Sequence, residues 1–284
     1  MEIRTLGVVG AGTMGAGIAQ VALQSRCGVL LRDVSEGILE AARRRVAAGL
    51  AKGVEKGKFS AADREAMLGG LKTTTDLADL APADFVVEAA TESFEIKRGL
   101  FLELDRLARP EVILASNTSS ISITKIAGVT KRPDRVVGMH FFNPVPLMAL
   151  VEVIRGLQTS DATAVATLEL ARRLGKTPVE ANDFPGFIAN RILVPMVNEA
   201  IYALMEGVGT AEAIDSVMRL GANHPMGPLA LADLIGLDVC LAVLKVLHEE
   251  LGDDKYRPCP LLVKMVDAGY LGRKTGRGFH TYER

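Results

Sequence analysis

The chain has 284 residues, which is long for one compact hydrophobic core, so two domains are expected. Hydrophobic residues make up 49% of it, and 33 basic against 34 acidic residues leave a formal net charge of −1. This balance argues against a nucleic-acid-binding protein. Neither a signal peptide nor an apolar run of membrane-spanning length can be read, so we expect no membrane partner and a cytoplasmic location.

The cysteines give little sign of a special site. Cys27, Cys240 and Cys259 are scattered and show no C-x-x-C spacing. This pattern suggests neither a disulfide framework nor a zinc site, and it suits a reducing cytoplasm. We therefore predict no bound metal.

A glycine-rich turn lies near the start of the chain. Residues 3–9 read as a buried strand and residues 17–23 as a helix, and between them stands Gly10-Ala11-Gly12-Thr13-Met14-Gly15. The pattern G-x-G-x-x-G between a strand and a helix is typical of dinucleotide binding. Gly10 allows the tight turn, Gly12 lets the backbone approach a pyrophosphate, and Gly15 lets the helix pack on the strand. The alternative is a turn that binds nothing.

The end of the second predicted strand bears on the choice of cofactor. Residues 29–31 read as this strand, and Asp33 follows them. A carboxylate here accepts hydrogen bonds from the adenosine ribose, which favours NAD(H) over NADP(H). Arg32 is the kind of residue that accommodates a 2′-phosphate, but we expect it to pair with Asp33 and to leave the carboxylate at the strand end.

A helical arm over residues 35–70 interrupts the usual alternation of strands and helices. Apolar residues recur with helical spacing from Ile38 to Val54, and a shorter helix runs back from residue 60 or 61 to Leu68. The polar face of the first helix is basic. Lys52 and Lys56 are candidates to meet a phosphorylated substrate, and the alternative is a solvated helix face.

Two later segments are predicted to line the cofactor. Residues 84–89 and 112–115 read as strands, the first followed by Glu92 and by a helix over 94–107 that bears Lys97, the second by residues 116–120 with Ser119. Ligands of open α/β sheets bind beyond the carboxyl ends of the strands. Ser and Asn also favour turns and caps for local reasons, and this alternative stays open.

The stretch over residues 135–154 contains the candidate acid/base pair. Its two apolar runs, 136–142 and 147–154, read as strands separated by a turn at residues 143–146. If they pair as an antiparallel hairpin, His140 and Glu152 can lie side by side. A carboxylate there would fix the imidazole tautomer and stabilise its protonated form, as a general acid/base needs. The alternative is a core histidine beside a solvated glutamate.

The character of the chain changes near residue 183. A helix over 161–174 and a strand from 177 to about 179 come before this point, and helices are predicted at about 187–207, 210–220, 227–250 and 261–268 after it. We therefore predict an α/β domain over 1–183 and an all-helical domain over 184–284. The run from Ile192 to Val197 is apolar on nearly all sides and contains Pro195, so we expect a kink there and burial against other helices or a second subunit. Asn190 is a polar group in that setting and needs a partner. The glycine-rich tail over 271–279 should dock back on the body.

With these motifs in hand, the chain resembles the L-3-hydroxyacyl-CoA dehydrogenases over essentially its full length, and most of all the bacterial 3-hydroxybutyryl-CoA enzymes. The resemblance rests on residues 10–15, 115–120, 138–144, 151–153, 185–191 and 224–228. It departs from many relatives at Ala149 and Ala230, where they have lysine and glutamate.

The resemblance implies a Rossmann-type NAD(H) domain followed by an all-α substrate domain, and the apolar run from Ile192 to Val197 predicts a homodimer through the C-terminal helices. It implies oxidation of the 3-hydroxyl group of an acyl-CoA, with His140 as general acid/base and Glu152 as its partner. Ser119 and Asn190 would contact the substrate, Lys56 coenzyme A with Lys52 as its neighbour, and the NAD contacts would be Glu92, Lys97, Ser119, Asn143 and Lys274. Two alternatives remain: a related dehydrogenase of free hydroxy acids or sugar acids, and a non-enzymatic NAD-binding protein.

Overall fold

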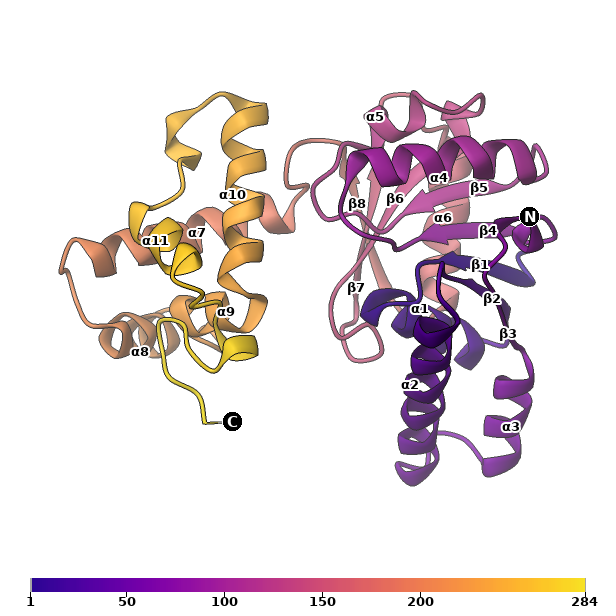
Figure 1. Ribbon diagram of the computed structural model, residues 1–284, viewed down its shortest axis with the longest axis horizontal. Coiled ribbons are helices and arrows are strands. Elements are labelled where there is room, and N and C mark those ends of the chain that lie inside the picture. The colour runs from indigo at the N-terminus through magenta and orange to yellow at the C-terminus, as the bar shows by residue number, and fades with distance from the viewer. Residues whose placement is uncertain (1, 284) are drawn as a thin grey trace. The chain divides into compact units, whose positions relative to one another are not determined.

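The computed structural model describes residues 2–283, and the chain divides into two compact units, Met1–Asp183 and Phe184–Arg284 (Figure 1). The first unit contains one eight-stranded sheet in the order β3-β2-β1-β4-β5-β6-β7-β8. Its strands are β1 Thr5–Val9, β2 Gly28–Arg32, β3 Leu71–Thr74, β4 Phe85–Glu88, β5 Ile113–Ser116, β6 Val136–Phe141, β7 Leu150–Arg155 and β8 Thr177–Asn182.

The pairing of the strands confirms the predicted dinucleotide-binding architecture. Strands β1 to β6 all run parallel to one another, β7 runs antiparallel to β6, and β8 runs parallel to β7. The central strands β4, β5 and β6 are buried at every residue. This explains why they read in the sequence as continuous apolar runs and not as alternating ones.

Helices cover the sheet and form the arm. Figure 1 shows α4 in front of the strands and α6 behind them, so both faces are covered. The arm consists of α2, which buries one apolar face that includes Leu39, Val46 and Leu50, and α3, which begins with a capping box between Ser60 and Asp63. The helices of this unit are α1 Thr13–Gln24, α2 Glu36–Glu55, α3 Ala61–Gly69, α4 Phe94–Leu107, α5 Ile123–Ala127 and α6 Asp161–Arg173, with 3-10 turns η1 Leu77–Leu80 and η2 Pro133–Arg135.

The second unit is helical, as predicted. In its described part, residues 184–283, the only β-pairings are two isolated bridges, which join Gly272 to Arg277 and Arg277 to Thr281. Its core gathers apolar residues such as Val197, Leu237 and Leu244. Its helices are α7 Ala189–Met205, α8 Ala211–Gly221, α9 Pro228–Ile235, α10 Leu237–Leu251 and α11 Pro260–Asp267, with 3-10 turns η3 Asp254–Tyr256 and η4 Arg273–Thr275.

The single helix predicted over residues 227–250 is wrong. Gly236 has φ +106 and separates α9 from α10. A Cβ atom at this position would lie 2.9 Å from Asp238 Oδ1 and 3.2 Å from Lys274 Nζ, so the break makes room for the contact between these two side chains. Helical spacing of apolar residues runs across the break, and it therefore hid a backbone conformation that glycine alone adopts readily.

The glycine-rich tail docks back on the second unit, as expected. Asp233, only 1% exposed, accepts hydrogen bonds from the Phe279 and His280 backbone N–H groups, each at 2.9 Å, and from the Tyr282 hydroxyl at 3.0 Å. Burial and the Asp233 carboxylate raise the pKa of Tyr282 to about 12. His280 Nε2 also lies 2.8 Å from Asp215 Oδ2, so two buried carboxylates hold the tail.

No helix among residues 2–283 has both the length and the apolar character that a membrane crossing requires.

We predict that Asp233→Ala lowers the free energy of unfolding by about 3 kcal/mol, because three partly buried donors lose their buried acceptor. Tyr282→Phe removes only one of these hydrogen bonds and should cost about 1 kcal/mol. Urea unfolding of the parent and both variants measures these losses, and Asp233→Ala should be the least stable of the three proteins. Equal stability of parent and Asp233→Ala would contradict the role of this carboxylate in the tail.

Candidate active site

The turn between β1 and α1 has the geometry of a phosphate-binding loop. Gly10 has φ +96, and a Cβ atom there would lie 2.6 Å from the Ala89 carbonyl oxygen. A Cβ atom on Gly15 would lie 1.7 Å from the Gly10 oxygen, whereas one on Gly12 would have no atom within 4 Å. The loop therefore needs glycine at 10 and 15 for its own packing, and at Gly12 it leaves open space beside the first turn of α1, where Thr13 and Met14 lie. A helix N-terminus with such an open approach suits a pyrophosphate.

A cavity of about 390 Å³ lies next to this turn. Asp33 stands in its wall with a fixed carboxylate, since Oδ2 accepts the Ala11 N–H and Oδ1 the Val34 N–H, both at 2.7 Å. Apolar side chains and one carboxylate together suit an adenosine, whose base is flat and whose ribose carries hydroxyls. The apolar part of the wall includes Val9, Val34, Ile38, Ile96 and Leu100.

The expected pairing of Arg32 with Asp33 is wrong. Arg32 Nε donates to the Thr75 carbonyl at 3.2 Å, and among residues 2–283 no ion pair joins Arg32 to Asp33. The backbone N–H groups of Ala11 and Val34, and not a guanidinium, therefore hold the Asp33 carboxylate. Arg32 also stands in the cavity wall, so both candidate determinants of cofactor choice face the same space.

The predicted contact between His140 and Glu152 is confirmed. The two residues face each other in the antiparallel register of β6 and β7, and His140 Nδ1 lies 2.8 Å from Glu152 Oε2. Both are buried, at 7% and 2% exposure. The Phe141 N–H beside them donates to Asn117 Oδ1 at 2.8 Å, which fastens this strand to the loop after β5. A buried imidazole with a carboxylate on one ring nitrogen is the arrangement that general acid/base catalysis uses.

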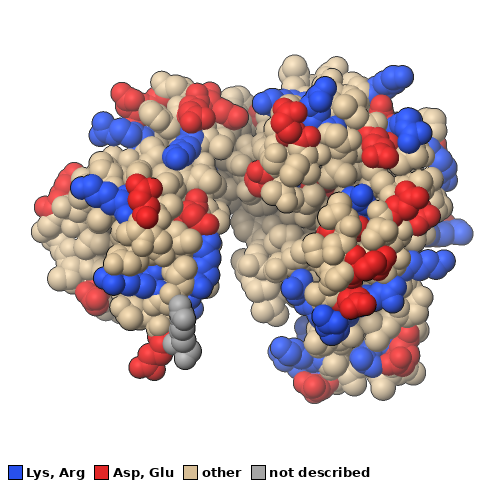
Figure 2. All heavy atoms as spheres, in the orientation of Figure 1, with Lys and Arg blue, Asp and Glu red and all other residues tan. Residues whose placement is uncertain are grey.

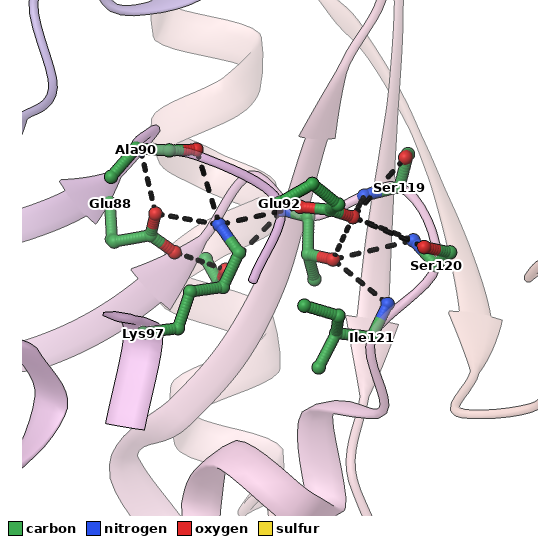
Figure 3. Close-up of polar contacts among 9 residues, drawn as sticks. Glu88, Ala90, Glu92, Lys97, Ser119, Ser120 and Ile121 are labelled. Atoms are coloured by element: carbon green, nitrogen blue, oxygen red, sulfur yellow. Dashed lines mark hydrogen bonds and ion pairs between the residues drawn. The ribbon is translucent and has the colours of Figure 1, made fainter. Parts of the chain in front are cut away.

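Glu92 joins the two segments predicted to line the cofactor (Figure 3). Its Oε1 accepts hydrogen bonds from the Thr118 hydroxyl at 2.5 Å, the Ser119 N–H at 2.9 Å and the Ser120 N–H at 3.2 Å. Burial by itself would raise the pKa of Glu92, but the Lys97 ammonium and these donors outweigh it, so the pKa lies below its usual range. Glu92 therefore stays ionised at neutral pH and fixes the loop that carries Ser119.

Lys97 lies beneath this loop and is only 1% exposed. Its ammonium is 2.7 Å from Glu88 Oε1 and 3.4 Å from Glu92 Oε2 (Figure 3). Lys97 was predicted from the sequence as a cofactor contact, whereas Glu88 was not predicted. An acidic residue that ends a buried strand, with a lysine nine positions later on the next helix, was the signal available in the sequence.

The remaining predicted residues lie elsewhere. Asn143 is exposed in the turn after β6, and Lys52 and Lys56 are exposed at the end of α2. Figure 2 shows basic and acidic side chains mixed over the arm. Asn190 and Lys274 belong to the second unit, where Lys274 Nζ lies 2.6 Å from Asp238 Oδ2. Residues 2–283 contain no cluster of three His, Cys, Asp or Glu side chains suited to a metal ion.

Comparison with protein families gives matches over nearly the whole chain. Residues 5–184 match the model described as 3-hydroxyacyl-CoA dehydrogenase, NAD binding domain. Residues 186–282 match the model described as 3-hydroxyacyl-CoA dehydrogenase, C-terminal domain.

Individual relatives are similar over the same length. The chain is 55% identical to a probable 3-hydroxybutyryl-CoA dehydrogenase of Bacillus subtilis, with 100% of this chain and 99% of the relative covered. It is 54% identical to the 3-hydroxybutyryl-CoA dehydrogenase of Bradyrhizobium diazoefficiens, with 99% and 96% covered. The crystal structure of (S)-3-hydroxybutyryl-CoA dehydrogenase from Ralstonia eutropha superimposes with a TM-score of 0.97 at 52% identity, and both chains are fully covered.

We predict that the Asp33 carboxylate makes kcat/KM at least about tenfold higher with NADH than with NADPH, because a 2′-phosphate would be repelled there. Asp33→Ser should reduce the preference for NADH, mainly by lowering KM for NADPH. Arg32 also faces the cavity and can then pair with the 2′-phosphate. Initial rates with both reduced cofactors check this. A parent that prefers NADPH would contradict it.

Proposed function

The chain belongs to the 3-hydroxyacyl-CoA dehydrogenase family and is an NAD(H)-dependent oxidoreductase, and from this premise we propose that the buried His140–Glu152 pair is its proton-transfer centre. The substrate is (S)-3-hydroxybutyryl-CoA, the compound in the names of the relatives, and oxidation of its 3-hydroxyl group gives acetoacetyl-CoA. The observation that supports the proposal best is the 2.8 Å contact between His140 Nδ1 and Glu152 Oε2, with both side chains buried.

The residues of this chain then have separate tasks. His140 accepts the proton of the substrate's 3-hydroxyl group during oxidation, and it returns a proton to the oxygen in the reverse direction. Glu152 orients the ring through Nδ1 and stabilises the imidazolium. Ser119 and Asn190 hold the reacting oxygen in place. The nicotinamide supplies or takes up the hydride when it is bound.

The cofactor-binding residues follow from the geometry of the first unit. The turn with Gly10, Gly12 and Gly15 would hold the pyrophosphate, and Asp33 the adenosine ribose. The fixed Asp33 carboxylate, the apolar cavity wall and the open space at Gly12 support this assignment. Beyond the turn and Asp33, the proposed NAD contacts are Glu92, Lys97, Ser119, Asn143 and Lys274.

The arm provides the proposed contact to coenzyme A. Lys56 and Lys52 are exposed and one turn apart at the carboxyl end of α2. An acyl-CoA carries a 3′-phosphate and a pyrophosphate, for which a flexible ammonium is a suitable partner. A dehydrogenase of free hydroxy acids would have no use for these charges, so the arm distinguishes the two activities.

The cellular setting is also a proposal. Cys27, Cys240 and Cys259 are free thiols and all three are buried, which suits a reducing compartment. We therefore propose a cytoplasmic enzyme, and recovery of the protein in a periplasmic fraction would contradict this.

We expect His140→Ala and Glu152→Gln each to lower kcat by about a hundredfold, the usual scale for general acid/base groups. Affinity for NADH should change little, because neither side chain lines the adenosine cavity. Saturating kinetics with acetoacetyl-CoA, together with NADH fluorescence titration, measure both quantities. Near-parental kcat in both variants would remove the pair from the mechanism.

Lys56→Ala should raise KM for acetoacetyl-CoA several-fold, leave kcat nearly unchanged and make KM less sensitive to salt. A short acetoacetyl thioester without the nucleotide serves as the matched substrate, and with it the variant should behave like the parent. Lys52→Ala tests the neighbouring position in the same way. Unchanged KM for the coenzyme A ester in both variants would exclude the arm from the site.

We also propose a homodimer formed through the C-terminal helices. In α7, Val194 and Val197 are buried but Ile192 is 67% exposed, and on α8 Val217 and Leu220 are 66% and 80% exposed. Apolar side chains in such number on helices of one unit favour burial against a second copy. Sedimentation equilibrium should give the mass of a dimer at micromolar concentration, and a monomer alone would reject the proposal.

A further inference from the structure

Glu88 and Lys97 form a fully buried ion pair, and Glu88 has no role in the function proposed above. Glu88 is 0% exposed, Lys97 is 1% exposed, and Lys97 Nζ lies 2.7 Å from Glu88 Oε1. Glu88 ends β4, paired with Val9 of β1 on one side and with Ser116 of β5 on the other. The pair therefore stands at the carboxyl edge of the sheet, next to the turn that begins at Gly10.

Stability is a weak explanation for such a pair. Taking two charges out of water costs several kcal/mol per ion, and apolar residues of similar volume often replace a buried pair without loss. The neighbouring buried positions of β4, from Phe85 to Val87, are all apolar. A charged pair in this place is better explained by what it holds in position.

Each oxygen of Glu88 fixes a different loop. Oε2 accepts the Ser116 hydroxyl at 2.6 Å, at the start of the loop that carries Ser119. Oε1 accepts the Ala90 N–H at 2.7 Å as well as the ammonium. Ala90 lines the adenosine cavity, and its backbone nitrogen lies 2.8 Å from where a Cβ atom on Gly10 would stand.

The Lys97 ammonium connects Glu88 to Glu92. Lys97 Nζ lies 3.4 Å from Glu92 Oε2, and the other oxygen of Glu92 accepts the Ser119 and Ser120 N–H groups (Figure 3). Lys97 thus lies between two carboxylates and closer to Glu88. Lys97 is absent from the wall of the adenosine cavity, and Glu92 is the residue that connects its ammonium to the loop of Ser119.

We propose that Glu88 is a positioning residue for the reaction: its buried carboxylate holds Lys97 at the distance from Glu92 that leaves Glu92 aligned with the loop of Ser119. The inference rests on the proposed function, because Ser119 is the residue that would hold the substrate oxygen. Without the charge of Glu88, the ammonium has Glu92 as its one remaining carboxylate. It then draws Glu92 away from Ser119 and Ser120.

Glu88→Gln tests this with little change of shape. The amide oxygen still accepts the Ala90 N–H, so the variant removes the charge and leaves the loop over the cavity in place. The matched control is Asp105→Asn, which disrupts another largely buried ion pair, Arg132 Nε to Asp105 Oδ1 at 2.7 Å. Neither Asp105 nor Arg132 contacts Glu92 or the loop of Ser119.

We expect Glu88→Gln to lower kcat for acetoacetyl-CoA reduction about tenfold, since small displacements of a positioning group cost this much or more. The dissociation constant of NADH should stay within about threefold of the parent. Amide hydrogen exchange of Ser119 and Ser120 should accelerate about tenfold, because both donate to Glu92. Asp105→Asn should lower Tm but change none of these quantities. Parental kcat and protection in Glu88→Gln, or equal losses in the control, would overturn the proposal.

A double variant, Glu88→Gln with Lys97→Met, tests whether Glu88 positions Glu92 or only stabilises the fold. This test works even if the single variant does not fold. The double variant removes both charges, so Tm should return toward the parental value. Glu92 Oε2 has then lost the ammonium that lies 3.4 Å from it and orients its carboxylate in the parent, so we expect kcat and the protection of Ser119 and Ser120 to remain low. If Tm, kcat and the protection of Ser119 and Ser120 all return to the parental values, the pair is purely structural and the proposal is overturned. If the parent itself does not reduce acetoacetyl-CoA, the proposed function fails, and hydrogen exchange still decides the role of Glu88.

Discussion

The antiparallel register of β6 and β7 is the constraint on which the rest of the site depends. In a pleated sheet a slip of one residue moves every side chain to the other face, so only one register sets His140 opposite Glu152. The buried apolar residues Met139, Val151 and Val153 on the same strands pack on the core and hold that register. Asn117 fastens β6 from the other side through the Phe141 N–H. A contact between two polar groups is thus fixed by the hydrophobic packing around them.

A second feature follows from where parallel strands end. The carboxyl edges of β1, β4 and β5 bring together the glycine turn, Glu88 and Ser116. The ionised side chains at this edge accept hydrogen bonds or ion pairs from the protein itself: Asp33 from backbone N–H groups, and Glu92 from the ammonium and the loop N–H groups. These contacts turn three flexible loops into one surface of fixed geometry. In the proposed mechanism that fixed geometry saves the enzyme the cost of reorganisation during hydride transfer.

Sequence patterns predicted the parts that depend on local chemistry. The glycine turn, the arm and the facing positions of His140 and Glu152 all follow from spacing within short segments. Strand β3 was not predicted, because Leu71–Thr74 is a short edge strand with no continuous apolar run. Helix α5 was not predicted either, because a contact distant in sequence stabilises it. The Asp183 carboxylate accepts the Ile123 and Thr124 N–H groups of this short helix from 60 and 59 residues away. The role of Lys97 likewise depends on burial that the tertiary structure creates.

In the proposed mechanism Glu152 fixes His140 as the Nδ1–H tautomer, so that Nε2 exchanges the proton with the substrate. Two-dimensional NMR of enzyme with ¹⁵N-labelled histidine reads the tautomer of each ring directly, and a His140→Gln sample assigns the signal. We predict that neutral His140 carries its proton on Nδ1 in the parent and loses this preference in Glu152→Gln. A neutral His140 protonated on Nε2 in the parent, or a tautomer unchanged by Glu152→Gln, would contradict the account.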